Sequence, residues 1–128
     1  MNSEVYETAL SYIQLIEGRI VRVELKKDQT IDRDKMLENL AVYKKILDGK
    51  KGLFISIVDP YSVPEDGLRS IYEAKQRIEI KEAEAFVVPN LSSRIEVEYL
   101  TVEVQKHYPR KLFKTKEEGM LWLRSFID

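Results

Sequence analysis

The middle of the chain carries a nearly continuous apolar run, Leu53-Phe54-Ile55-Ser56-Ile57-Val58. The run has the length of one strand and lacks the regular alternation of a strand that faces water on one side. Such a strand is typical of the centre of a sheet that is covered by helices on both faces. The run therefore predicts an α/β protein with a parallel or mixed sheet.

Two segments before this run alternate between apolar and polar residues, over residues 8–16 and 19–25. Glu17 and Gly18 separate them and form a turn signal. Two alternating segments across a short turn that contains glycine predict a β-hairpin.

A helix is predicted between the hairpin and the apolar run, over residues 33–47. Its apolar residues recur at helical spacing, with Asp32 as a candidate N-cap and Asp48-Gly49 as the end. The residues expected on the buried face are Met36, Leu40, Tyr43 and Leu47.

After the run, Ser62-Val63-Pro64-Glu65 fits a capping box with proline in the first turn, so a helix is expected to extend to about Arg77. A second buried strand is expected over residues 83–88, ending at Pro89-Asn90. Another helix is expected to begin at Asn90 or Ser92 and to continue to about residue 106. Residues 95–104 also alternate like a strand, but the length and the flanking prolines favour the helix.

The last predicted elements are a short strand over residues 111–113 and a helix that opens with a capping box at residues 115–118. The residues expected to face inward on that helix are Leu121, Trp122, Ser125 and Phe126. The complete predicted order is ββαβαβαβα, in one α/β domain over residues 1–128 with a single mixed sheet and helices packed on it.

The composition favours a soluble protein and argues against several function classes. The net charge is −1, with 21 basic and 22 acidic residues, so a nucleic-acid partner is not expected. The absence of cysteine excludes disulfides and thiolate chemistry. Neither a signal peptide nor an apolar run of about 20 residues is visible, so we expect a cytoplasmic protein that is not inserted in a membrane.

We expect no catalytic residues, metal site or cofactor, and therefore no enzyme. The single histidine, His107, has no indicated partner that could make it a general base. Glu79, Glu82 and Glu84 lie near one another in sequence and are expected to be solvated. The glycines do not form a phosphate-binding pattern.

Two loops remain as candidate surfaces, because ligands of open α/β sheets bind at the carboxyl ends of parallel strands. Both loops also precede predicted helices, whose first N–H groups can hold an anion, although ordinary capping explains the same residues. The loops span residues 59–66 and 89–94, and the candidate residues are Asp59, Tyr61, Ser62, Glu65, Asp66, Asn90, Ser92, Ser93 and Arg94.

The end of the chain reads Pro109-Arg110-Lys111-Leu112-Phe113-Lys114-Thr115-Lys116-Glu117-Glu118-Gly119-Met120-Leu121-Trp122-Leu123. Together with the element order, this stretch resembles the ending of small bacterial proteins with a STAS-like (SpoIIAA-like) fold. The segment from Phe54 to Leu68 resembles the strand, loop and capped helix at the centre of that fold. The resemblance covers about residues 8–127.

The resemblance implies a non-enzymatic regulatory or protein-interaction module. Some members switch when a serine or threonine near the start of the helix after the central strand is phosphorylated. The matching stretch here is residues 63–67, which contains no hydroxyl group, and Ser62 lies too early. The phosphorylation switch and the sigma-factor role are therefore not carried over. A small-molecule or lipid-binding domain that uses the two loops is the alternative.

A possible homodimer is suggested by two apolar stripes on the predicted helix over residues 91–106. One consists of Leu91, Ile95, Tyr99 and Val102, and is expected to face the sheet. The opposite stripe consists of Val97, Leu100, Val104 and Tyr108. A helix on a sheet needs only one such stripe, so a second copy is one candidate to cover the other, beside a neighbouring helix of the same chain.

Overall fold

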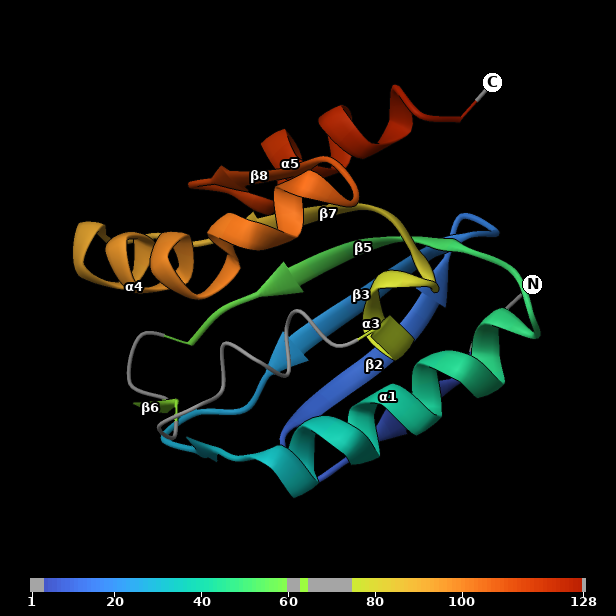
Figure 1. Ribbon diagram of the computed structural model, residues 1–128, viewed down its shortest axis with the longest axis horizontal. Coiled ribbons are helices and arrows are strands. Elements are labelled where there is room, and N and C mark those ends of the chain that lie inside the picture. Colours follow the sequence, from blue (N-terminus) through green and yellow to red (C-terminus); the bar gives the residue numbers. More distant parts are fainter. Residues whose placement is uncertain (1–3, 60–62, 65–74, 128) are drawn as a thin grey trace.

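A six-stranded mixed sheet forms the centre of the computed structural model, which describes residues 4–59, 63–64 and 75–127 (Figure 1). Strands β1 to β3 are antiparallel, whereas β3, β5, β7 and β8 run parallel. In sheet order the strands are β1 (Val5–Glu7), β2 (Ser11–Ile16), β3 (Ile20–Leu25), β5 (Gly52–Ile57), β7 (Lys81–Val87) and β8 (Arg110–Phe113). The predicted α/β class with one mixed sheet is confirmed.

The predicted hairpin is formed by β2 and β3. Glu17 and Gly18 both have positive φ, 48° and 82°, which is the backbone that a tight hairpin turn requires. β1 was not predicted, because it is only three residues long and two of them are exposed.

Helix α1 (Arg33–Leu47) has the predicted bounds and covers one face of the sheet. Asp32 caps it, with its Oδ1 accepting a hydrogen bond from the Lys35 backbone N at 2.9 Å. Its buried face packs on Val21, Val23 and Phe54, and the rings of Tyr43 and Phe54 meet edge to face at 5.0 Å.

Helix α5 (Lys116–Arg124) covers the opposite face, where Leu123 packs with Leu53, Ile55 and Ala85. Figure 1 shows α5 beside β7 and β8, whereas α1 lies along β2. The predicted inward face of α5 was partly wrong: Leu121 and Ser125 are exposed, and Gly119 and Leu123 are buried in their place. The buried face of α5 is displaced by about one residue from the predicted face, because the helix packs against Ile55 and Ala85 at Gly119.

Helix α4 (Leu91–Thr101) continues as the 3₁₀-helix η1 (Val102–Lys106), so residues 95–104 are helical as predicted. Val97 packs against Phe86 and Val88, on the sheet face that also carries α1. The sheet therefore has α1 and α4 on one face and α5 on the other.

A second, two-stranded sheet joins β4 (Thr30–Ile31) to β6 (Val63–Pro64) in parallel. Pro64 therefore lies in a strand, not in the first turn of a helix as predicted. The short α3 (Lys75–Ile78) includes Arg77, which was expected near a helix end. The proposed cap at Ser62 lies outside the described residues. Within the described part of the chain, no helix is long and apolar enough to cross a membrane.

Candidate functional site

The two candidate loops follow the carboxyl ends of parallel strands, as expected, and these strands, β5 and β7, are neighbours in the sheet. β5 and β7 pair in parallel up to Ile57 and Val87, and the backbone N of Val58 donates to the Val87 carbonyl at 3.1 Å. Asp59 and Asn90 therefore begin their loops at the same edge of the sheet. Tyr61, Ser62, Glu65 and Asp66 lie outside the described residues.

Asp59 connects the end of β5 to the turn that follows β3. Its Oδ2 accepts a hydrogen bond from the backbone N of Asp28 at 3.1 Å, and Asp28 has a positive φ of 55° in the turn after β3. Asp59 also lines an open groove of about 480 Å³ with Tyr12, Lys26 and Ile57. Asp59 thus stabilises this edge of the sheet and borders a surface hollow.

Asn90 is the N-cap of α4, and its Oδ1 accepts a hydrogen bond from the backbone N of Ser93 at 2.8 Å. Ser92 is exposed beside it. The capping explanation of this loop is confirmed for Asn90. These residues fix where α4 begins and thereby fix the position of Arg94, one turn into the helix.

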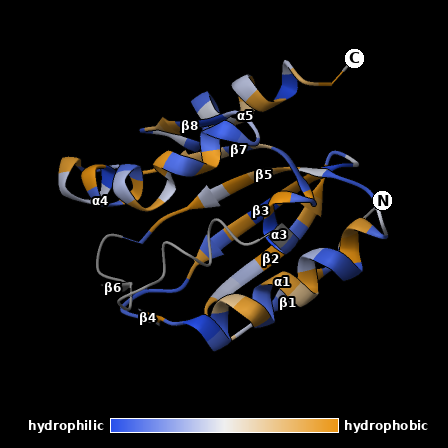
Figure 2. Cartoon of the chain, in the orientation of Figure 1, coloured by the Kyte–Doolittle hydropathy of each residue, from blue (hydrophilic) through white to orange (hydrophobic). Residues whose placement is uncertain are grey.

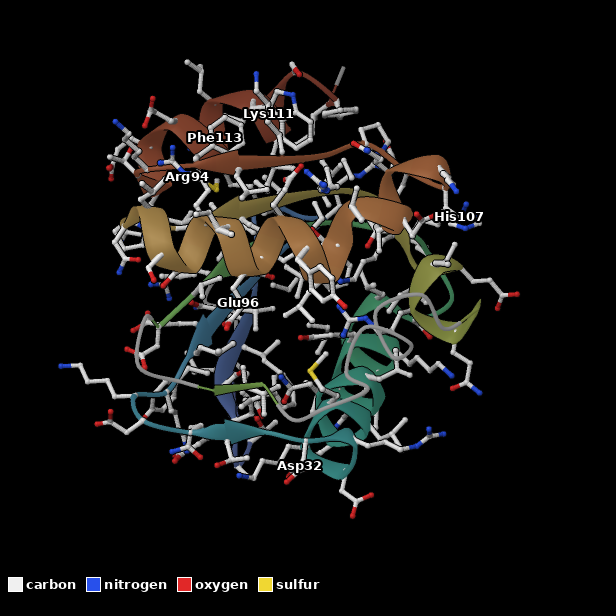
Figure 3. All side chains as sticks on the ribbon, turned by 60° about the vertical axis from the view of Figure 1, so that its left-hand side comes forward. Asp32, Arg94, Glu96, His107, Lys111 and Phe113 are labelled. Atoms are coloured by element: carbon white, nitrogen blue, oxygen red, sulfur yellow. The ribbon has the colours of Figure 1, made fainter. Side chains whose placement is uncertain are left out.

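Arg94 lies between α4 and the edge strand β8 (Figure 3). It borders a groove of about 380 Å³. The other residues that line the groove are Ile95 and Glu98 of α4 and Arg110, Lys111 and Leu112 of β8. Of the predicted site residues that the structure describes, Arg94 is the one that borders this groove.

The outer face of α4 is apolar. Leu91, Ile95 and Tyr99 are 69%, 63% and 63% exposed, at successive positions four residues apart. Figure 2 shows how α4 mixes hydrophobic and hydrophilic positions along its length. The assignment of the two stripes was therefore reversed.

The stripe expected to be free belongs largely to the core. Val97, Val104 and Tyr108 are buried, and Leu100 packs against a cluster that contains Leu10 and Met36. This stripe cannot form the suggested dimer contact without unfolding that part of the protein. The apolar surface available to a partner is the one that was expected to face the sheet.

A buried polar cluster, which was not predicted from the sequence, lies between α1 and α4. Glu84 was expected to be solvated, but Lys81 and Glu84 side chains are each 1% exposed, and Lys81 Nζ lies 2.8 Å from Glu84 Oε2. Tyr108 donates its hydroxyl hydrogen to Glu84 Oε1 at 2.8 Å, and Ser56 donates to Oε2 at 3.3 Å. Glu82, in contrast, forms a surface ion pair with Arg19.

Burial and neighbouring charges shift both members of this pair. Burial and the nearby charge of Arg77 lower the pKa of Lys81, Glu84 opposes them, and the result is a pKa of about 7. Burial raises the pKa of Glu84, but Lys81, Arg77 and the hydrogen bonds from Lys81 and Tyr108 outweigh it, so the pKa lies below its ordinary value.

The cavity beside this cluster is small. It measures about 50 Å³, and its lining includes Asn39, Ser56, Arg77, Glu84 and Glu96. That volume accommodates about three water molecules. Binding pockets for small molecules usually exceed about 300 Å³. A lysine with a pKa near neutrality can act as a base or nucleophile, but here it is enclosed and paired. The cluster holds β7, β5 and the end of η1 together.

His107 lies at the end of η1, exposed and remote from Arg94 (Figure 3). Among residues 4–59, 63–64 and 75–127, no three histidine, aspartate or glutamate side chains are placed to hold a metal ion.

A comparison with protein families matches residues 13–127 to a family described as a domain of unknown function, DUF7793. No curated protein and no solved structure matches the chain. The matched region begins within β2 and extends past α5, so it leaves out β1 and contains the polar cluster and the α4 surface. The chain belongs to the DUF7793 family.

Proposed function

We propose that the chain is a non-enzymatic, STAS-like regulatory or interaction module that binds another protein through α4 and the groove beside it. The observation that carries the proposal is the row of exposed apolar side chains Leu91, Ile95 and Tyr99. Single exposed apolar residues are common, but three on one helix face beside an open groove are typical of a contact surface.

The open shape of the two grooves and the small volume of the cavity support a protein partner over a small molecule. The groove at Arg94 and the groove at Asp59 are open surface features, and the cavity among the polar cluster measures about 50 Å³. A protein contact needs an accessible face with apolar anchors, whereas a small ligand needs a concave pocket that buries most of its surface.

Site-specific photo-crosslinking in the protein's native cells tests this function. A photoreactive phenylalanine analogue is introduced in place of Tyr99 and, as the control, in place of Leu121, which is 71% exposed on α5. We expect a discrete crosslink to a different protein from position 99 and none from position 121. Crosslinks of the same pattern from both positions, or none from position 99, would contradict the proposal.

A further inference from the structure

We propose that the groove between α4 and β8 binds an extended, acidic segment of a partner protein, which adds to β8 as a further strand of the sheet. This inference rests on the proposed function and specifies its binding mode and the chemistry of the partner. Three features of the described residues support it: the free edge of β8, the positive charge of the groove and the unpaired arginine donors.

β8 lies at the end of the strand order, with β7 as its neighbour in the sheet. The Glu84 backbone N donates to the Pro109 carbonyl at 3.0 Å, and the Val88 backbone N donates to the Phe113 carbonyl at 2.7 Å. In a parallel ladder, alternate residues of a strand face a given neighbour. The backbone groups of Arg110 and Leu112 therefore point away from β7, toward the free edge. Each carries one donor and one acceptor, which an added strand can pair.

The groove presents more positive than negative charge. Arg94, Arg110 and Lys111 line it together with one carboxylate, Glu98. Glu98 Oε2 is already paired with Arg110 Nη1 at 2.8 Å. The remaining positive charge is complementary to acidic side chains on a partner.

Two arginine donors in the groove also lack acceptors. The Arg110 side chain is only 5% exposed, and within the described part of the chain neither its Nη2 nor Arg94 Nε has a hydrogen-bond partner. A buried donor without an acceptor destabilises the structure. A carboxylate in the groove would pair with the part of the Arg94 guanidinium group that lines it.

The same charges argue against a second copy of this chain as the occupant. Antiparallel pairing of β8 with β8 of another copy, centred on Lys111, would place the two Lys111 side chains directly opposite each other. Like charges on directly paired strands are destabilising. Ile95 and Leu112 add apolar contact area along the groove, which suits the apolar side chains that alternate with acids on an extended peptide.

Peptide selection tests this proposal. A phage-displayed library of random peptides is selected on the full chain, and enriched peptides are synthesised and measured by fluorescence anisotropy. We expect peptides in which acidic residues alternate with β-branched or aromatic residues. Enrichment of basic or uncharged peptides, or no enrichment, would overturn the proposal. Binding to phosphatidylserine vesicles in preference to the selected peptide would overturn it as well.

The ligand backbone provides a test that leaves the protein unchanged. An enriched peptide is resynthesised with N-methyl groups on either of its two alternating sets of residues. We expect one set to abolish binding, because its N–H groups pair with β8, and the other set to bind normally. Equal binding by both versions excludes strand addition.

A matched pair of charge reversals tests the location. Lys111→Glu lies in the groove, whereas Lys116→Glu makes the same change at an exposed position on α5. We expect Lys111→Glu to weaken the peptide on the order of tenfold and Lys116→Glu to leave the affinity unchanged. Equal effects would overturn the groove as the site. If position 99 still crosslinks to a partner in that case, the interaction function stands and only the strand-addition mode fails.

Discussion

Lys81 and Glu84 form a buried ion pair although they are three residues apart on one strand, with Nζ 2.8 Å from Oε2. Strand residues three apart ordinarily point to opposite faces of a sheet. The pairing of β5 with β7 shifts register between Gly52 and Leu53, which pair with Lys81 and Ala83, so Glu82 is an extra residue. This irregularity brings both side chains to the same face.

Removing one member of this pair is expected to destabilise the protein strongly. Glu84→Gln removes the carboxylate whose charge offsets those of Lys81 and Arg77 in the buried cluster, and we expect a loss of about 3–5 kcal/mol in the free energy of unfolding. Urea denaturation of Glu84→Gln, Lys81→Met and the double variant measures the coupling. The double variant should lose less than the sum of the single variants, by about 1–3 kcal/mol.

An exposed ion pair provides the control for that cycle. Arg124 Nη2 lies 2.8 Å from Glu17 Oε1 at the surface, where solvent screens the attraction. Glu17→Gln should leave the free energy of unfolding unchanged within error. Additive losses at Lys81 and Glu84, or a similar loss at Glu17, would show that the buried pair is not coupled.

The depressed pKa of Lys81 predicts that stability rises with pH. Burial lowers this pKa to about 7, against 10.5 for an unperturbed lysine. Between these values the unfolded chain binds a proton that the folded protein lacks, so the free energy of unfolding increases by at most ~1.4 kcal/mol per pH unit. Glu84 does not titrate in this range, because its pKa lies below 4.5.

Comparison with Lys81→Met isolates this effect. Urea denaturation of both proteins at several values between pH 7 and pH 10 gives the difference in stability at each pH. The difference should grow in favour of the wild-type protein as pH rises. A difference that is constant with pH would mean that Lys81 keeps an ordinary pKa.

Local signals predicted most of the framework. The signals that were predicted correctly depend only on residues close together in the sequence, and the corresponding elements are present. They are the alternation in residues 8–16 and 19–25, the apolar run over residues 53–58 and the cap at Asp32. The polar cluster could not be predicted in this way. Its members come from β5, α3, β7 and the end of η1, and the bulge at Glu82 that aligns two of them depends on strand pairing.

The buried position of Asn39 also could not be predicted from local signals, although its helix was otherwise predicted correctly. It lies on the buried face of α1, where the pattern suggested apolar residues. Its Oδ1 accepts from the Thr8 hydroxyl at 2.6 Å, and its Nδ2 donates to Ser11 Oγ at 3.0 Å. These contacts connect α1 to the start of β2 across about 30 residues of sequence, as the separations of 31 and 28 residues show.

Replacing Asn39 is expected to lower the free energy of unfolding, because its side-chain amide bonds two buried hydroxyl groups. Asn39→Leu keeps the number and branching of the side-chain heavy atoms but leaves the Thr8 and Ser11 hydroxyl groups without this partner, so we expect a loss of about 2 kcal/mol. The double variant with Ser11→Ala and Asn39→Leu should lose less free energy of unfolding than the sum of the two single variants. It removes the Ser11 hydroxyl group, which lacks its partner when Asn39 alone is replaced. Thermal or urea unfolding measures each variant. A gain in stability from Asn39→Leu alone would contradict the assigned role.

The two apolar stripes of α4 and η1 are expected to differ in their tolerance of charge. Sequence periodicity identified both stripes, but it assigned the wrong one to the sheet. Val104 is 0% exposed, whereas Ile95 is 63% exposed. Val104→Glu buries a carboxylate without a designed partner and should cost several kcal/mol, enough to unfold much of the protein. Ile95→Glu also introduces a carboxylate, but at a position that is exposed to solvent. It should leave the circular dichroism spectrum and the unfolding midpoint nearly unchanged. If the two variants were equally stable, the packing of this segment on the sheet would be wrong. If Ile95→Glu also removed the crosslink from position 99, the exposed stripe would be the partner surface.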